Sequence, residues 1–119
     1  VPNVEPLVGD IYDSALVAQL EERGPFDAII SDAAPRTTGN RSVDTARSAA
    51  LVEQVMALCP RLLQPGGSLV AKLFQGGDEQ TLHGWVRRNF HTARLVKPRA
   101  SRSESFEVFL VGTGYNPQI

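Results

Sequence analysis

Residues 26–40 read FDAIISDAAPRTTGN, and this stretch decides the fold and the place to look for a functional site. The apolar run Phe26–Ile30 predicts a short buried strand, and the proline and glycine that follow Asp32 predict a loop. In open α/β sheets, ligands bind and chemistry occurs outside the carboxyl ends of parallel strands. Asp32 is therefore the first candidate for a functional residue.

The composition of the 119-residue chain is that of an ordinary globular domain, with 42% hydrophobic and 21% charged residues. This composition does not favour a disordered or fibrous protein, and no apolar run approaches the roughly 18 residues of a membrane-spanning helix. The chain begins with Val1 and shows no signal or transit peptide, so we expect a processed start or a piece of a longer protein. The single cysteine, Cys59, excludes an internal disulfide, fits a reducing cytoplasmic compartment and is expected to be a buried structural thiol.

Charge is distributed unevenly, although the net charge is only −1. Residues 1–40 carry seven acidic and two basic side chains, whereas residues 83–102 carry six basic side chains and no acidic one. A segregated positive segment attracts polyanions such as RNA. A solvated helix face followed by a loop would show the same charge, so both interpretations stay open.

Hydrophobic periodicity predicts alternating strands and helices along the chain. Strands are expected at Val4–Val8, Phe26–Ser31, Ser68–Phe74, Phe90–Val96 and Phe106–Val111. Helices are expected from an Asp13 cap through Arg23, from Val43 to about Leu63, and from an Asp78 cap through Asn89. This order is that of an α/β layered sheet, and the two closing strands with no helix between them predict an antiparallel last strand.

The long second helix has a predicted cap, a predicted irregularity and a predicted apolar face. Ser42 is positioned to cap it, and Pro60 should kink it or end its regular part early. The apolar residues at helical spacing are Ala46, Ala50, Leu51, Val55, Leu58 and Leu62.

Three ionisable residues lie in or beside apolar strands: Asp32, Lys72 and Glu107. Burying an unpaired ammonium is costly, so Lys72 should be paired, have an altered pKa, or lie near the sheet rim. Asp32 and Glu107 are natural partners if their strands neighbour that of Lys72, and such a lysine can take or hold a proton. Each residue also has an ordinary explanation: a loop cap for Asp32, an exposed edge for Lys72, and a solvent-facing position for Glu107.

Asp10 and the two histidines are weaker candidates. Asp10 follows the first expected strand, where acidic residues accept hydrogen bonds from nucleotides, but a turn with Asp10 or Asp13 as helix cap explains it equally well. His83 and His91 lie eight residues apart with no further ligand nearby, so we expect no metal site and assign both to surface and packing.

Six motifs occur in order along the chain: SDAAP at 31–35, GNRSVD at 39–44, PGGS at 65–68, KLFQG at 72–76, KP at 97–98 with SRS at 101–103, and EVF at 107–109. Together they resemble the FtsJ/RrmJ family, heat-shock methyltransferases that modify a ribose 2′-hydroxyl of large-subunit ribosomal RNA. The resemblance covers essentially the whole chain. It implies a Rossmann-like S-adenosylmethionine-dependent methyltransferase sheet with an antiparallel last strand, truncated at the N-terminus, so that residues 1–119 form a partial methyltransferase domain.

The resemblance also assigns roles to residues. The family uses a Lys-Asp-Lys-Glu tetrad, whose last three members match Asp32, Lys72 and Glu107. Lys72 would be the base or proton-holding group for the ribose hydroxyl, and the two carboxylates would orient it. S-adenosylmethionine would be contacted by Asp10, Asp32 and Pro35. The resemblance further implies a cytoplasmic protein that acts on RNA of the 50S particle and does not involve a membrane. The residues that would contact this RNA are Arg41, Arg87, Arg88, Lys97, Arg99 and Arg102.

The first tetrad lysine, the glycine-rich cofactor loop and the acid on the ribose hydroxyls of the cofactor have no counterpart in this chain. We therefore expect the parent protein to be the enzyme and this chain alone to be inactive. Without the family's first two strands, open sheet edges should leave Val4–Val8 displaced, re-paired or supplied to another copy. The alternatives are a non-catalytic chain that binds RNA or self-associates through its sheet edges, and a related methyltransferase acting on an mRNA cap or a small molecule.

Overall fold

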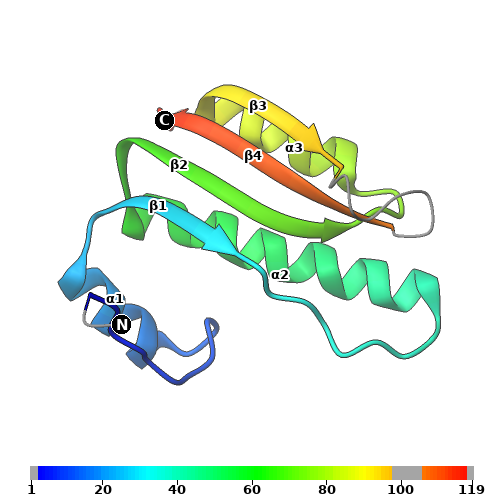
Figure 1. The fold of residues 1–119 in the computed structure, drawn as a ribbon, viewed down its shortest axis with the longest axis horizontal. Helices are drawn as coiled ribbons and strands as arrows, with labels where there is room; N and C mark the ends of the chain where they lie inside the picture. The colour runs from blue at the N-terminus through cyan, green and yellow to red at the C-terminus, as the bar shows by residue number, and fades with distance from the viewer. Residues whose placement is uncertain (1–2, 98–105, 118–119) are drawn as a thin grey trace.

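A computed structural model describes residues 3–97 and 106–117 of the chain. In this part of the chain, helices and strands follow one another as α1 (Ser14–Arg23), β1 (Phe26–Ser31), α2 (Arg41–Leu62), β2 (Leu63–Phe74), α3 (Glu79–Asn89), β3 (Phe90–Val96) and β4 (Glu107–Tyr115) (Figure 1). The predicted α/β class is confirmed, and most predicted elements agree with the observed ones to within a few residues.

The described strands form one mixed sheet in the order β1-β2-β4-β3. β1 and β2 are parallel, and β4 runs antiparallel to both β2 and β3. The prediction of an antiparallel last strand is therefore confirmed. Because β2 lies between β1 and β4, the strands that carry the three candidate residues are direct neighbours.

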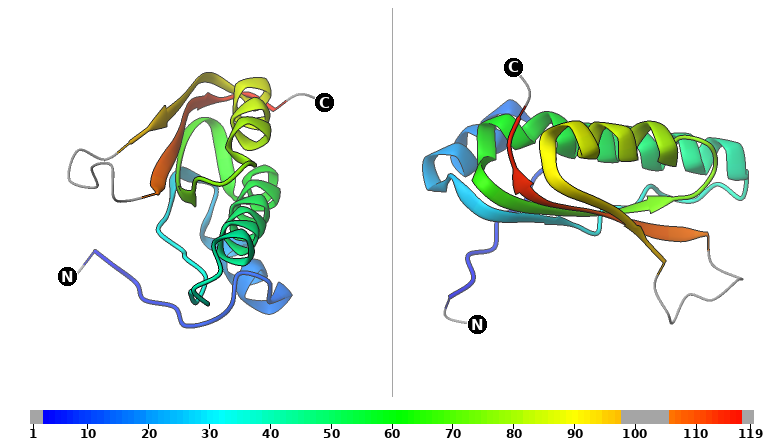
Figure 2. Two further views of the ribbon diagram at one scale, coloured as in Figure 1. Left: turned by 90° about the vertical axis from the view of Figure 1, so that its right-hand side faces the viewer. Right: turned by 90° about the horizontal axis from the view of Figure 1, so that it is seen from above.

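The described helices all lie on one face of the sheet, and the core is packed between them and that face (Figure 2). Leu69 and Leu73 of β2 and Leu110 of β4 are fully buried there, and their removal from water is the main stabilising contribution. Cys59 of α2 is also fully buried, which confirms the structural thiol, and burial raises its pKa to about 12. None of the helices in the described ranges is long and apolar enough to cross a bilayer.

The opposite face of the sheet has no helix over it in the part of the chain that the structure describes. Ile30 of β1 lies on this face, opposite Val70 of β2, and is 76% exposed. The expectation that β1 is a buried strand is therefore wrong. β1 is an edge strand, and the half of its side chains that point away from the helices face solvent.

The prediction of a strand at Val4–Val8 is also wrong. Residues 3–10 are exposed and lie outside any helix or strand. A strand needs a neighbour for its backbone N–H and C=O groups, and none of the described strands pairs with this segment. Glu5 instead forms a 2.8 Å ion pair with Arg23 of α1, so the segment is displaced from the sheet.

The cap of α2 differs from the prediction. Asn40, rather than Ser42, precedes the helix, and its side-chain oxygen accepts a hydrogen bond from the Val43 amide at 3.1 Å. Pro60 does not end the helix early, since α2 continues to Leu62. The other predicted effect of Pro60, a kink in the helix, stays a prediction.

The buried face of α2 is rotated from the predicted one. Ala46 and Ala50 are exposed, whereas Val55, Leu58 and Leu62 are buried as predicted. The first turns of the helix bury three polar side chains. These are the three residues Asp44, Thr45 and Ser48.

Candidate functional site

The carboxyl ends of β1 and β2 bring the candidate residues together. Ser31 pairs with Ala71 in the parallel register, so Asp32 after β1 lies beside Lys72 of β2. β4 runs back from the same edge, and its first residue, Glu107, lies on the other side of β2. Residues 32, 72 and 107 thus converge from three neighbouring strands.

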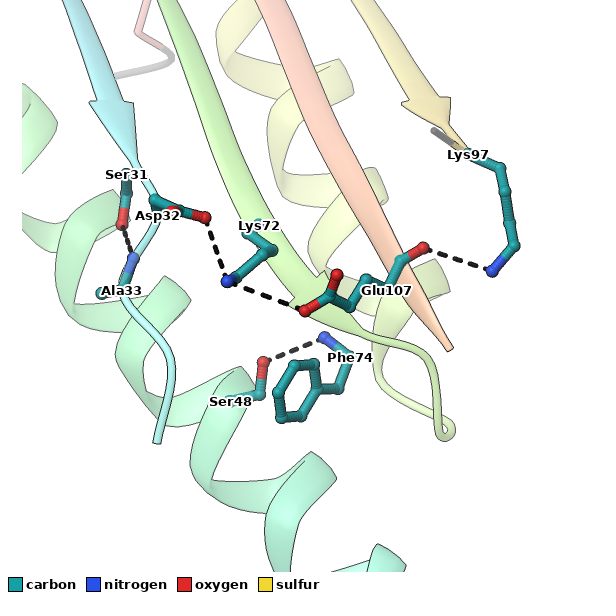
Figure 3. A network of polar contacts seen from close by, with 8 residues as sticks. All are labelled: Ser31, Asp32, Ala33, Ser48, Lys72, Phe74, Lys97 and Glu107. Carbon is teal, nitrogen blue, oxygen red and sulfur yellow. Dashed lines mark hydrogen bonds and ion pairs between the residues drawn. The ribbon is translucent and has the colours of Figure 1, made fainter. Parts of the chain in front are cut away.

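Lys72 lies between the two carboxylates (Figure 3). Its Nζ is 3.0 Å from Asp32 Oδ1 and 3.7 Å from Glu107 Oε2. The Lys72 side chain is only 15% exposed, Glu107 is 36% exposed and Asp32 is 81% exposed. The predicted pairing is confirmed, and the cation is the most buried member of the group.

The surroundings of Lys72 favour its charged form. The hydrogen bond to Asp32 raises the pKa of Lys72 above its ordinary value, burial opposes this, and the charges of Asp32 and Glu107 add to it. At neutral pH the amine is therefore an ammonium that donates to Asp32. Such a group can orient a hydroxyl oxygen, and its neutral form can accept a proton.

A hollow of about 310 Å³ opens beside Asp32. Apolar side chains of β1, α1 and α2 form most of its wall, including Ile29, Leu20 and Leu58, and Asp32 is also among the lining residues. An apolar wall of this kind suits the apolar part of a small ligand. The contact of Asp32 with S-adenosylmethionine stays a prediction.

The other predicted cofactor residues are placed less directly. Asp10 Oδ1 accepts the Tyr12 amide at 2.9 Å, so this carboxylate stabilises the turn before α1, while Asp13 is the helix cap. Ile11, which follows Asp10, lines the hollow beside Asp32. Pro35 is half-buried in the loop after Asp32. The cofactor contacts of Asp10 and Pro35 stay predictions.

The four described basic residues that are predicted to bind RNA lie in two separate places. Arg41 begins α2 near the site and lies over the Phe106 ring, 4.8 Å from its centre. Lys97 follows β3 at the same edge, and its Nζ donates to the Glu107 carbonyl at 3.3 Å. Arg87 and Arg88 lie in the last turn of α3, which leads into the opposite end of β3. Arg99 and Arg102 lie outside the described residues.

Sequence reasoning missed two residues next to the site. Asp44 accepts hydrogen bonds from the loop after Asp32. Ser48 accepts one from the end of β2, as Figure 3 shows. Polar residues in a helix are ordinarily expected to face solvent, so residue type alone did not indicate that Asp44 and Ser48 are buried. Their spacing of four residues, on the helix that follows Asp32, was the available sign of a shared face.

A metal site and a second hollow are the other features that could mark a functional site. Within residues 3–97 and 106–117, no group of three or more His, Cys, Asp or Glu side chains is placed to hold a metal ion. His83 is half-buried and His91 exposed, as expected for packing and surface residues. A larger hollow of about 410 Å³ lies between α2 and α3 against Trp85, and none of Asp32, Lys72 and Glu107 lines it.

Comparison with known proteins places the chain among methyltransferases. Residues 1–115 match the family described as FtsJ-like methyltransferase. Over 107 residues, the chain is 50% identical to ribosomal RNA large subunit methyltransferase E of Treponema denticola. The aligned region covers 90% of the chain and 54% of the relative. It is 45% identical to the protein of the same name from Syntrophobacter fumaroxidans, covering 89% of the chain and 54% of the relative. The chain therefore spans about half the length of these relatives.

A solved structure shares the fold. The crystal structure of a ribosomal RNA methyltransferase from Plasmodium falciparum superimposes with a TM-score of 0.87 at 23% sequence identity. The match covers 99% of this chain and 67% of that chain. At this identity the likeness establishes the fold alone, and it confirms the expected Rossmann-like methyltransferase architecture.

Proposed function

This chain belongs to the FtsJ-like methyltransferase family, and from that premise we propose that it serves the transfer of a methyl group from S-adenosylmethionine to a ribose 2′-hydroxyl of large-subunit ribosomal RNA. The observation that carries the proposal is the convergence of Asp32 and Glu107 on the half-buried Lys72, at distances of 3.0 and 3.7 Å. The site of action would be the 50S particle in the cytoplasm.

The proposed chemistry divides between the cofactor and the chain. Bound S-adenosylmethionine would supply a methyl group already activated on a sulfonium sulfur. The hollow beside Asp32, with Ile11 and Ile29 in its wall, would hold part of it. Asp10 and Pro35 would make further contacts. The contribution of the chain is then to position the ribose oxygen and to handle its proton.

Lys72 would act on the ribose hydroxyl directly. In its ammonium form, Nζ donates to Asp32 Oδ1 and holds a hydroxyl oxygen through another N–H. In its neutral form, Nζ accepts the hydroxyl proton as the oxygen bonds to the methyl carbon and the carbon–sulfur bond breaks. Asp32 and Glu107 keep the amine oriented and stabilise the ammonium that forms.

The names of the relatives and the positions of the basic side chains support an RNA substrate. The relatives named above are large-subunit ribosomal RNA methyltransferases, which favours this substrate over an mRNA cap or a small molecule. Arg41 and Lys97 lie at the edge of the sheet where Lys72 lies, so they would contact phosphates close to the modified ribose. Arg87, Arg88, Arg99 and Arg102 would extend the contact elsewhere. Binding through phosphates predicts an affinity that falls with added salt.

The test is methyl transfer to isolated large-subunit particles by the complete protein that carries this chain. Lys72→Ala should lower the transfer of labelled methyl by a factor of about 10² to 10⁴, the usual contribution of an acid–base residue. Arg61→Ala removes another cation from an ion pair, that with Glu21, and serves as the control because it lies on the surface. Undiminished transfer by the Lys72 variant would refute the assignment.

One observation favours a second candidate, a non-catalytic chain that self-associates. β1 is an edge strand that pairs only with β2 among the described strands, and Ile30 on the helix-free face is 76% exposed. Open edges pair with other chains. Sedimentation of the 119-residue chain tests this candidate, and a monomer at all concentrations would exclude it. Binding of labelled S-adenosylmethionine to the same chain would favour the enzyme instead.

A further inference from the structure

The buried polar residues of the described chain gather in one place. Asp44, Thr45 and Ser48 are 4%, 8% and 2% exposed and lie in the first turns of α2. The rest of the buried face of this helix is apolar, and residues such as Val52 and Cys59 continue it. Polar groups are buried in proteins when they have hydrogen-bond partners. The partners of Asp44 and Ser48 connect α2 to the segments that carry the candidate site, whereas the Thr45 hydroxyl donates to the Ser42 carbonyl within the helix.

Ser48 holds the end of β2. Its hydroxyl oxygen accepts the Phe74 amide at 2.9 Å, across 26 residues of sequence (Figure 3). Phe74 is two residues beyond Lys72 and pairs with Glu107 in the antiparallel register. The hydroxyl therefore fixes the strand at the point where Lys72 and Glu107 meet.

Asp44 holds the loop that follows Asp32. Its Oδ1 accepts both the Thr38 amide and the Thr38 hydroxyl, each at 2.8 Å. These bonds, the Thr38 amide first, lower the pKa of Asp44, so the carboxylate is charged at neutral pH. The next residue, Gly39, has a φ of +87°, a backbone conformation that lets the chain turn back into α2. The loop is thereby closed against the helix.

Thr45 packs between these two contacts. A Cβ atom on Gly76, in the turn after β2, would come within 2.4 Å of Thr45 Cγ2. The turn therefore lies directly on the helix, and only glycine fits there. The loop after β1 and the end of β2 are both held by one rigid element.

We propose that Asp44 and Ser48 are positioning residues, which set the place of Asp32 relative to Lys72 from one face of α2. Neither side chain touches the reacting atoms in this account. Asp44 acts through the loop and Ser48 through the strand, and their spacing of four residues puts both on the same side of the helix. The catalytic consequence rests on the proposed function, whereas the structural consequence does not.

The structural consequence is tested on the isotopically labelled chain by amide hydrogen exchange and by titration of the Lys72 amine. Ser48→Ala should speed exchange of the Phe74 amide at least tenfold and move the Lys72 titration toward that of ordinary lysine. Asp44→Ala should do the same for the Thr38 amide. The matched controls are Ser42→Ala, at an exposed position of the same helix, and Asp78→Ala, whose carboxylate makes no cap hydrogen bond.

Unchanged Phe74 exchange and an unchanged Lys72 titration in the Ser48→Ala variant would overturn the proposal. If Ser48→Ala does not fold, Ser48→Thr serves as the second variant. It keeps the hydroxyl, so Phe74 exchange and the Lys72 titration should both be unchanged. An altered Lys72 titration in a folded Ser48→Thr variant would also contradict the proposal. In the complete protein, Ser48→Ala should lower kcat of methyl transfer about tenfold and leave KM within about twofold, since misplacement impairs catalysis more than binding. Absence of activity in the unsubstituted protein would refute the proposed function alone.

Discussion

Two ion pairs of this chain differ in a way that separates a working site from a structural contact. Arg61 and Glu21 form a two-point contact on the surface, with a shortest distance of 2.6 Å and side chains 47% and 37% exposed. Lys72 and Asp32 are farther apart, at 3.0 Å, but Lys72 is 15% exposed and faces a second carboxylate. The closer pair joins α1 to α2, whereas the longer one joins β2 to the residue after β1, and Glu107 adds a contact from β4.

The difference shows that distance alone does not mark a functional cation. Water and salt weaken an exposed pair, so a short contact there contributes little. A shielded cation between two carboxylates has an altered proton affinity, and a change in either partner alters it further. The predictions below test this contrast between the two pairs, in order of decreasing effect.

The largest expected effect is the pH dependence of methyl transfer. Asp32 and Glu107 raise the pKa of Lys72, so the neutral amine is a minor form that increases tenfold per pH unit throughout the range below that pKa. If Lys72 accepts the ribose proton, single-turnover rates should rise about tenfold per pH unit from about pH 6 to 9. A rate that is flat across this range would show that Lys72 stays protonated and acts by charge alone.

The next effect concerns the two carboxylates separately. Asp32→Asn should lower the pKa of Lys72, because the hydrogen bond to Asp32 is the main cause of its elevation. Glu107→Gln should lower it less, since Glu107 lies 3.7 Å away. NMR titration of the Lys72 side chain measures both shifts. An equal or larger shift in the Glu107 variant would contradict the geometry.

A smaller effect is expected at Asp44. Its pKa in the folded chain lies below the ordinary value of 3.8, so its stabilising effect is present above that value and is lost as pH falls through the lower, folded one. Protection of the Thr38 amide should therefore be high near neutrality and decrease in acid. In Asp44→Asn, protection at neutral pH should be weaker and nearly independent of pH. Acid-insensitive protection in the unsubstituted chain would count against the Asp44 contact.

The smallest effect is expected at the surface pair. Arg61→Ala should lower the free energy of unfolding only slightly, as is usual for exposed ion pairs. Urea unfolding measures this change, and added salt should reduce it further. A loss several times larger would mean that exposure does not distinguish the two pairs.

The sequence predicted the centre of the site well because its signal was chemical. A lysine inside the apolar run of β2 required a partner, and Asp32 and Glu107 had the right charge at the ends of the neighbouring strands. The order of strands could not be derived from periodicity. The sheet topology supplied it and confirmed the pairing.

The errors arose where side chains were judged by type or by neighbours in sequence. Asp44 and Ser48 are polar yet buried, because their partners come from segments that only the fold brings near. Ser42 and Asn40 are both good cap residues, and local geometry selects Asn40. Arg88 and Lys97 are close in sequence, but the length of β3 separates them.

The most direct test of the central claim is methyl transfer by Lys72→Arg in the complete protein. Arginine keeps the positive charge and can pair with Asp32 and Glu107, but it does not give up a proton at any accessible pH. Mass analysis of the RNA for a 2′-O-methyl group should find transfer by Lys72→Arg reduced about as strongly as by Lys72→Ala. Transfer by Lys72→Arg close to that of the unsubstituted protein would contradict the claim that Lys72 handles the ribose proton.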